Sequence, residues 1–144
     1  MPFADGADGA DGALAAVSGA VRTVLVVDDE PLVRGVLVEI LDVLGHEAIA
    51  VESGEEAIEL LSAREGPLAA AFIDVKMRGM SGLACVVELR RIRPGLPCVV
   101  ISGLSAEEIS GAVPSGVAWL AKPFTVADVR QALAALPLGA GRLR

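Results

Sequence analysis

Five side chains with metal-binding or phosphate-binding chemistry each follow directly on a short apolar run of this sequence. They are three aspartates, a serine and a lysine: Asp28, Asp29, Asp74, Ser102 and Lys122. Carboxylates that lie close together repel one another, and a hard divalent cation relieves that repulsion. Mg²⁺ prefers oxygen ligands, with few protein carboxylates and several waters. The aspartates therefore predict a Mg²⁺ site wherever the fold brings them together.

The serine and the lysine extend this chemistry to phosphoryl transfer. The hydroxyl of Ser102 can donate a hydrogen bond to an incoming anion, and the ammonium of Lys122 is a point charge suited to phosphate. With a carboxylate and Mg²⁺ they make a site in which the carboxylate acts as the nucleophile. Each aspartate taken alone is more simply a helix cap or a turn former. The occurrence of all five residues, in order, at the ends of apolar runs favours the functional interpretation.

The apolar runs predict five strands, which alternate with five helices along the chain. We expect strands over 22–27, 46–51, 68–74, 98–101 and 117–121. Helices are expected to begin near Pro31, Ser53, Leu83, Ser105 and Thr125, with capping spacing at Ser53–Glu56, Ser105–Glu108 and Thr125–Asp128. This alternation predicts an α/β fold with a doubly wound five-stranded parallel sheet. Ligands of such sheets bind beyond the carboxyl ends of the strands, where the five polar residues would meet.

Composition supports a buried aliphatic sheet and argues against several classes of protein. The chain has 144 residues, 53% of them hydrophobic but only 3% aromatic. The net charge of −7 and the lack of a basic run speak against nucleic-acid binding by this chain, because phosphate contacts need a concentrated positive face. No stretch reaches the roughly 18 apolar residues of a membrane span. The start does not resemble a signal peptide, so a cytoplasmic location is expected.

Changes of composition along the chain predict three segments. Residues 1–20, which repeat Asp-Gly-Ala, are expected to form a flexible tail. A calcium-binding repeat is the alternative, although the run lacks the closing bidentate glutamate of such sites. Residues 21–137 should form the folded domain, and 138–144 a C-terminal tail. The two cysteines, Cys85 and Cys98, are too few for a zinc site and are expected to be reduced core residues.

Four motifs occur in one order and together carry a family resemblance. VLVVDDEP, AAFIDVKMRGMSG, VVISG and WLAKPF are similar to the motifs of receiver domains of two-component systems. The resemblance covers roughly residues 22–136, and the ordered set is far more specific than any one motif. It implies a flavodoxin-like (βα)5 receiver fold. It also implies a response regulator that takes a phosphoryl group from a histidine kinase or a histidine phosphotransfer protein. Such a regulator is a signalling switch rather than an enzyme, and it acts through protein–protein contacts.

The resemblance implies a role for each acidic residue. Asp74 is similar to the phosphoacceptor of the family. Asp29 resembles a direct Mg²⁺ ligand, and Asp28 resembles its partner, which acts through a water molecule. The backbone carbonyl of Lys76 would complete the ligands that the protein supplies. Mg²⁺ is therefore the cofactor that the family resemblance implies.

The same resemblance implies which residues respond to the phosphoryl group. Lys122 would pair with it, and Ser102 would donate a hydrogen bond to it and move toward it on activation. Trp119 stands where the family carries its switch aromatic residue, usually Tyr or Phe, and a plain packing role is the alternative. The face over residues 105–136 commonly changes on activation in this family. That face is the expected contact for a downstream protein or for a second copy in a homodimer.

Two positions in the loop after the expected phosphoacceptor set this chain apart. The family usually carries Pro directly after the Met, but here Arg78 follows Met77, so a residue that fixes φ is lost. The loop is therefore expected to be more mobile, without loss of phosphorylation. Lys76 could reach over the phosphoryl group and modulate its lifetime. Alternatively, it could be a solvated surface lysine.

Other classes of protein fit these residues less well. A phosphorylation-independent docking module would not need the intact acidic set. Aspartyl-nucleophile phosphatases carry a DxDx[TV] pattern, which Asp28-Asp29-Glu30-Pro31 does not match. Nucleotide-binding enzymes are also a poor fit, because neither GxxxxGK[ST] nor GxGxxG occurs. The single histidine, His46, is far in the pattern from the acidic residues, so neither a histidine kinase nor a phosphotransfer protein is expected. The initial Met and the short C-terminal stretch favour a stand-alone receiver.

Overall fold

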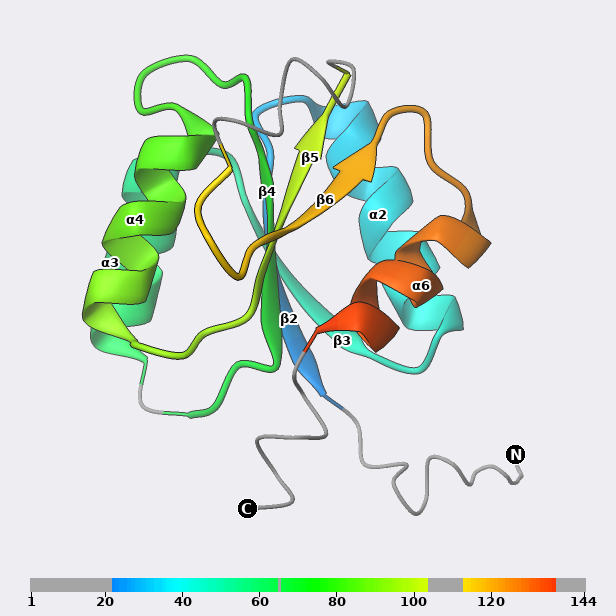
Figure 1. Ribbon diagram of the computed structural model, residues 1–144, viewed down its shortest axis with the longest axis horizontal. Coiled ribbons are helices and arrows are strands. Elements are labelled where there is room, and N and C mark those ends of the chain that lie inside the picture. The colour runs from blue at the N-terminus through cyan, green and yellow to red at the C-terminus, as the bar shows by residue number, and fades with distance from the viewer. Residues whose placement is uncertain (1–21, 65, 104–112, 137–144) are drawn as a thin grey trace.

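The computed structural model describes residues 22–64, 66–103 and 113–136, and these residues form a layered α/β arrangement (Figure 1). One five-stranded sheet lies in the middle, with helices packed on both of its faces. The two tails predicted from composition lie outside the described residues. The same is true of the helix predicted to begin at Ser105.

Five strands make up the sheet, and each corresponds to one of the predicted apolar runs, with ends that differ by up to two residues. They are β2 (Thr23–Val27), β3 (Glu47–Val51), β4 (Ala70–Asp74), β5 (Cys98–Ser102) and β6 (Ala118–Ala121). All neighbouring strands are parallel, in the order β3-β2-β4-β5-β6. The doubly wound parallel sheet is therefore confirmed. Its strand order reverses between β2 and β4, which is where ligands bind in such folds.

Helices cover both faces of this sheet. The helices in the described part of the chain are α2 (Pro31–Val43), α3 (Gly54–Ala63), α4 (Gly82–Ile92) and α6 (Val126–Ala135). α2 and α6 lie on one face, and α3 and α4 lie on the other (Figure 1). None of these helices is long and apolar enough to cross a membrane. The sheet is thus shielded from solvent on both sides, as parallel sheets generally are.

The predicted capping residues mark where two of the helices begin. At α6, Thr125 and Asp128 form the predicted capping box. At α3 only half of the predicted box forms. The Oγ of Ser53 accepts a hydrogen bond from the backbone N–H of Glu56 at 3.0 Å, but the Glu56 carboxylate accepts from the backbone of Glu52 instead of Ser53. The serine therefore still satisfies one of the free N–H groups at the start of α3.

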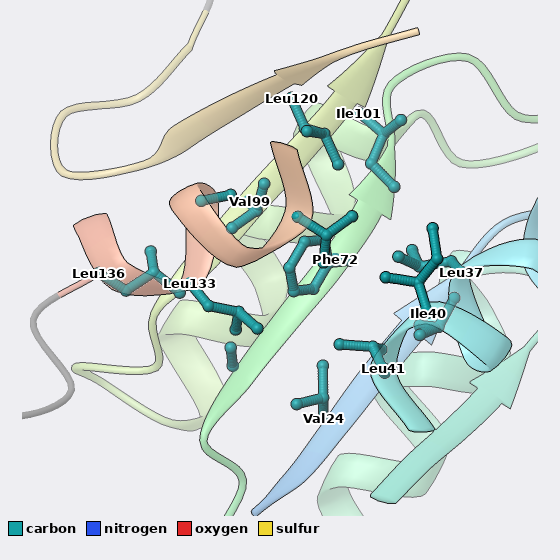
Figure 2. Close-up of a cluster of buried hydrophobic side chains, with 14 residues drawn as sticks. Val24, Leu37, Ile40, Leu41, Phe72, Val99, Ile101, Leu120, Leu133 and Leu136 are labelled. Atoms are coloured by element: carbon teal, nitrogen blue, oxygen red, sulfur yellow. The ribbon is translucent and has the colours of Figure 1, made fainter. Parts of the chain in front are cut away.

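The sheet separates two hydrophobic clusters, because successive residues of a strand point to opposite faces. In β2, Val24 and Val26 belong to the cluster beneath α2 and α6, whereas Leu25 and Val27 belong to the cluster beneath α3 and α4. Figure 2 shows the first of these clusters, in which Phe72 is the largest fully buried side chain. Burial on both faces explains why the central strands β2, β4 and β5 appear in the sequence as continuous apolar runs.

Both cysteines are buried free thiols, as predicted. They pack in the cluster beneath α3 and α4. Burial raises the pKa of Cys85 to about 12 and the pKa of Cys98 to about 11. Because the thiolate is the reactive form, both side chains are inert at neutral pH and serve as small core residues.

Candidate functional site

The five predicted site residues lie at one edge of the sheet. Each lies at or just beyond the carboxyl end of a strand: Asp28 and Asp29 after β2, Asp74 in β4, Ser102 in β5 and Lys122 after β6. Because the strands are parallel, these ends meet at the same edge. One carboxylate oxygen from each of the three aspartates lies within 4.8 Å of the others. Asp74, Ser102 and Lys122 also line a common pocket. The structure therefore brings all five together.

Asp74 lies at the centre of this cluster and is almost fully buried, with 3% of its surface exposed. Its Oδ1 accepts a hydrogen bond from the backbone N–H of Lys76 at 3.2 Å. Its Oδ2 accepts from Lys122 Nζ, also at 3.2 Å, in an ion pair whose lysine side chain is 26% exposed. These partners fix the carboxylate in the pocket, while the partly exposed ammonium can still attract an anion from solvent.

Asp28 provides the test of whether the cluster suits a metal ion. Its side chain is buried. Oδ1 accepts from the backbone N–H of Glu30 at 2.9 Å, and Oδ2 has no hydrogen-bond partner among the described residues. Burial raises the pKa of this carboxyl group to about 6, and the charge of Asp74 adds to the effect. A buried carboxylate oxygen without a partner is costly, and a hard cation would satisfy it. The cluster therefore fits Mg²⁺.

We predict that Mg²⁺ binding at this cluster weakens as the pH falls through about 6. A proton and Mg²⁺ compete for Asp28, because a carboxylate ligand must be deprotonated. With its pKa raised to about 6, the group is mostly ionised at about pH 7.5 and mostly protonated at about pH 5. Calorimetric titration should show roughly a tenfold loss of affinity between these two conditions. A dissociation constant that does not change over this range would contradict the prediction.

Asp29 is held by a residue that the sequence did not identify as part of the site. Its Oδ2 accepts a hydrogen bond from the backbone N–H of Arg78 at 3.0 Å and a second from Arg78 Nε at 3.4 Å. The backbone hydrogen bond is the main reason why the pKa of Asp29 lies below its usual range. The signal in the sequence was the missing proline, since only a residue other than proline has an N–H to donate here.

Two further residues contact the backbone of the aspartates and were not predicted. Arg34, on α2, donates from Nη1 to the backbone carbonyl of Asp28 at 2.8 Å. Gly82, the first residue of α4, packs so closely on the end of β4 that an added Cβ would lie 1.9 Å from the backbone oxygen of Asp74. The helix was predicted to begin near Leu83, one residue later than α4 does. The role of Gly82 in packing depends on a contact between two elements that no local pattern reveals.

Trp119 and His46 lie outside the acidic cluster. Trp119, on β6, packs against the cluster beneath α3 and α4, and its Nε1 is buried without a hydrogen-bond partner in the described part of the chain. His46 immediately precedes β3, so it lies at the amino-terminal edge of the sheet, opposite the aspartates. Burial lowers the pKa of His46 and favours the neutral ring. The prediction that this histidine stands apart from the site is consistent with that position.

A family model described as "Response regulator receiver domain" matches residues 24–134. Among curated proteins, the chain is 34% identical over 116 residues to the probable transcriptional regulatory protein TcrX of Mycobacterium tuberculosis. That alignment covers 79% of this chain and 49% of TcrX. The chain thus spans about half the length of this relative.

Solved structures agree with this match. A response regulator receiver protein from Sinorhizobium medicae is 31% identical, with a TM-score of 0.69, over 80% of this chain and 96% of that one. The response regulator TrrA of Thermotoga maritima, solved in complex with Mg²⁺–BeF, is 27% identical with a TM-score of 0.67, over 79% of this chain and 97% of that one. The sheet edge that carries the aspartates therefore belongs to a fold found repeatedly in receiver proteins.

Proposed function

The chain belongs to the response regulator receiver domain family, and on that basis we propose that it is a phosphorylatable switch with Asp74 as its phosphoacceptor. The observation that supports this most directly is the position of Asp74. It is a buried carboxylate within reach of two further carboxylates and paired with Lys122 at 3.2 Å. No other carboxylate in the described residues combines an adjacent acidic pair with a partly exposed ammonium at the carboxyl edge of the sheet.

The proposed reaction moves a phosphoryl group from a phosphohistidine to Asp74. A carboxylate oxygen attacks the phosphorus, the O–P bond forms as the P–N bond breaks, and the electron pair of that bond leaves with the imidazole. The phosphohistidine would belong to a histidine kinase or a histidine phosphotransfer protein, since the single histidine of this chain lies at the other edge of the sheet. The product is an acyl phosphate on this chain.

Lys122, Ser102 and the proposed Mg²⁺ ligands together stabilise the negative charge that this transfer brings into the pocket. Lys122 pairs with the transferred phosphoryl oxygens, and the hydroxyl of Ser102, which lines the same pocket, donates a hydrogen bond to one of them. The residues proposed to hold Mg²⁺ are Asp28, Asp29, Asp74 and, through its backbone carbonyl, Lys76. When bound, Mg²⁺ supplies positive charge that offsets the carboxylates and the phosphoryl oxygens. The complex of TrrA with Mg²⁺–BeF supports this choice of cation.

The proposed output is a change in protein–protein contacts, and the partner would bind at the side of the domain formed by β6 and α6. Trp119 lies on β6, three residues before Lys122, so a movement of the lysine and its strand would reach the indole directly. The partners would be a downstream protein or a second copy of the chain, through the face predicted over 105–136. Part of this face lies outside the described residues.

Fluorescence of Trp119, the single tryptophan, tests this proposal. We expect a change in emission when Mg²⁺ and then beryllofluoride are added, and no beryllofluoride response when Asp74 is replaced by Asn. If emission stays constant and a small phosphodonor leaves no acyl phosphate detectable by mass, the chain acts as a phosphorylation-independent docking module instead. That outcome would refute the proposed switch.

Replacement of Lys76 by Ala should shorten the lifetime of the acyl phosphate. Lys76 lines the pocket that holds Asp74, Ser102 and Lys122. Its side chain is long enough to cover the phosphoryl group and to hinder the water that would hydrolyse it. We expect hydrolysis to become about two- to fivefold faster in Lys76→Ala, and to stay close to the original rate in Lys76→Arg. Equal rates in all three proteins would show that Lys76 is only a surface lysine.

A further inference from the structure

One residue outside the proposed ligand set holds a proposed ligand by hydrogen bonds. Arg78 lies in the loop between β4 and α4, and both its backbone N–H and its side-chain Nε donate to Oδ2 of Asp29, at 3.0 and 3.4 Å. The same carboxylate oxygen therefore accepts two hydrogen bonds from a single residue. Asp29, Arg78 and Lys76 also line a shared hollow at the surface, so this contact lies at the outer side of the acidic cluster.

The hydrogen bond from the backbone N–H of Arg78 to Asp29 fixes the position of the Arg78 backbone, from which the charged side chain extends. It joins residues 49 positions apart in the chain, and so ties the loop to the end of β2. The Arg78 side chain itself is 90% exposed, and an exposed ion pair alone would hold it only weakly. The backbone amide holds residue 78 next to Asp29, so the guanidinium lies within reach of the carboxylate. Its positive charge therefore stays near the carboxylate even when the side-chain contact itself breaks.

A fixed positive charge at this place opposes a second cation. The guanidinium is positively charged, and a unit charge a few ångströms from a divalent ion repels it even in a solvent-exposed setting. The two hydrogen bonds from Arg78 also stabilise the negative charge of the Asp29 carboxylate. A cation that binds Asp29 must share or replace that stabilisation.

We propose that Arg78 is an internal competitor of the divalent cation and sets its affinity for the acidic cluster. This inference rests on the proposed function, since it requires that Mg²⁺ binds at Asp28, Asp29 and Asp74. In the structure the guanidinium Nε bonds to Oδ2 of Asp29. When the cation binds, the guanidinium leaves Asp29 and turns into solvent. The site therefore binds Mg²⁺ less tightly than the three carboxylates would without Arg78.

The test compares Mg²⁺ affinities by calorimetric titration at about pH 7.5 in the original protein and in Arg78→Gln. This substitution keeps the backbone N–H and a polar side chain but removes the charge. We expect Arg78→Gln to bind Mg²⁺ about three- to tenfold more tightly, and to show a steeper loss of affinity with added salt, because its site is more negative. The matched control is Arg91→Gln on α4, where the arginine is 71% exposed and paired with Glu88. This control should leave the affinity unchanged.

A second measurement follows Arg78 directly. In ¹H–¹⁵N spectra, the Nε–H resonance of Arg78 should move toward that of a free arginine when Mg²⁺ is added, whereas the Nε–H resonance of Arg91 should not. Equal or weaker Mg²⁺ binding in Arg78→Gln, or an unmoved Nε–H resonance at saturating Mg²⁺, would overturn the competitor role. Those results would leave the proposed phosphoryl switch in place. Absence of Mg²⁺ binding from both the original protein and Arg78→Gln would instead overturn the metal site and, with it, the competitor.

Discussion

Replacement of Asp74 by Asn is expected to abolish formation of the acyl phosphate. The substitution keeps the size of the side chain, but a neutral amide does not attack phosphorus as a carboxylate does. The neighbouring carboxylates are poor substitutes. Asp28 is buried and its Oδ1 accepts a hydrogen bond from the backbone N–H of Glu30, and Oδ2 of Asp29 accepts a hydrogen bond from Arg78.

Mass spectrometry after incubation with Mg²⁺ and a small phosphodonor measures this directly. The original protein should gain one phosphoryl group that hydroxylamine removes, as expected of an acyl phosphate, and Asp74→Asn should gain none. Asp42→Asn is a matched control, because Asp42 is an exposed residue of α2 away from the carboxyl edge of the sheet. A hydroxylamine-sensitive adduct that persists in Asp74→Asn would place the phosphoacceptor elsewhere.

Replacement of Gly82 by Ala should be strongly destabilising, by about 3 kcal/mol or more in the free energy of unfolding. An added Cβ would lie 1.9 Å from the backbone oxygen of Asp74 and 2.7 Å from its carbonyl carbon. Both are backbone atoms, so no side-chain rotation relieves the overlap. The first turn of α4 would have to move away from the end of β4, and Asp74 would move with it.

Gly35→Ala provides the matched control for this effect. Gly35 lies in the interior of α2, and nothing lies within 4 Å of the Cβ it would gain. Alanine is intrinsically better in a helix than glycine by about 0.5–1 kcal/mol, so Gly35→Ala should be stabilising. Urea denaturation of both variants separates the cost of the backbone overlap at residue 82 from the gain in helix propensity. A Gly82→Ala protein as stable as the original would show that α4 does not pack on Asp74 as described.

The arrangement of the strands could be predicted because each strand is a continuous apolar run that ends at a polar residue. Burial on both faces of a parallel sheet produces such runs, and parallel pairing brings their carboxyl ends to one edge. From these two facts alone, Asp28, Asp29, Asp74, Ser102 and Lys122 were expected to meet. Strand ends were less certain, and Ser102 proved to be the last residue of β5 rather than the residue after it.

The contacts that support the site could not be predicted, because they depend on distances between elements. Arg34 reaches the carbonyl of Asp28 from the next helix. Gly82 looks like any loop glycine until the approach of α4 to β4 is known. The contact of Arg78 with Asp29 spans 49 positions and depends on the path of one loop. Even at α3, the choice of Glu56 between two adjacent backbone N–H groups was decided by local geometry that the capping pattern does not contain.

The alternation of β2 between the two hydrophobic clusters has a consequence for how this protein tolerates changes in length. Val24 and Val26 pack in one cluster, and Leu25 and Val27 pack in the other. The same alternation determines the directions in which Asp28 and Asp29 point after the strand ends. Deletion of one codon within Thr23–Val27 would exchange the two sets of core residues and shift both carboxylates together. Insertions in connecting loops leave this alternation intact. In a library of single-codon insertions and deletions, functional survivors should therefore be depleted in β2 and retained in the loops at the amino-terminal edge of the sheet, away from the acidic cluster.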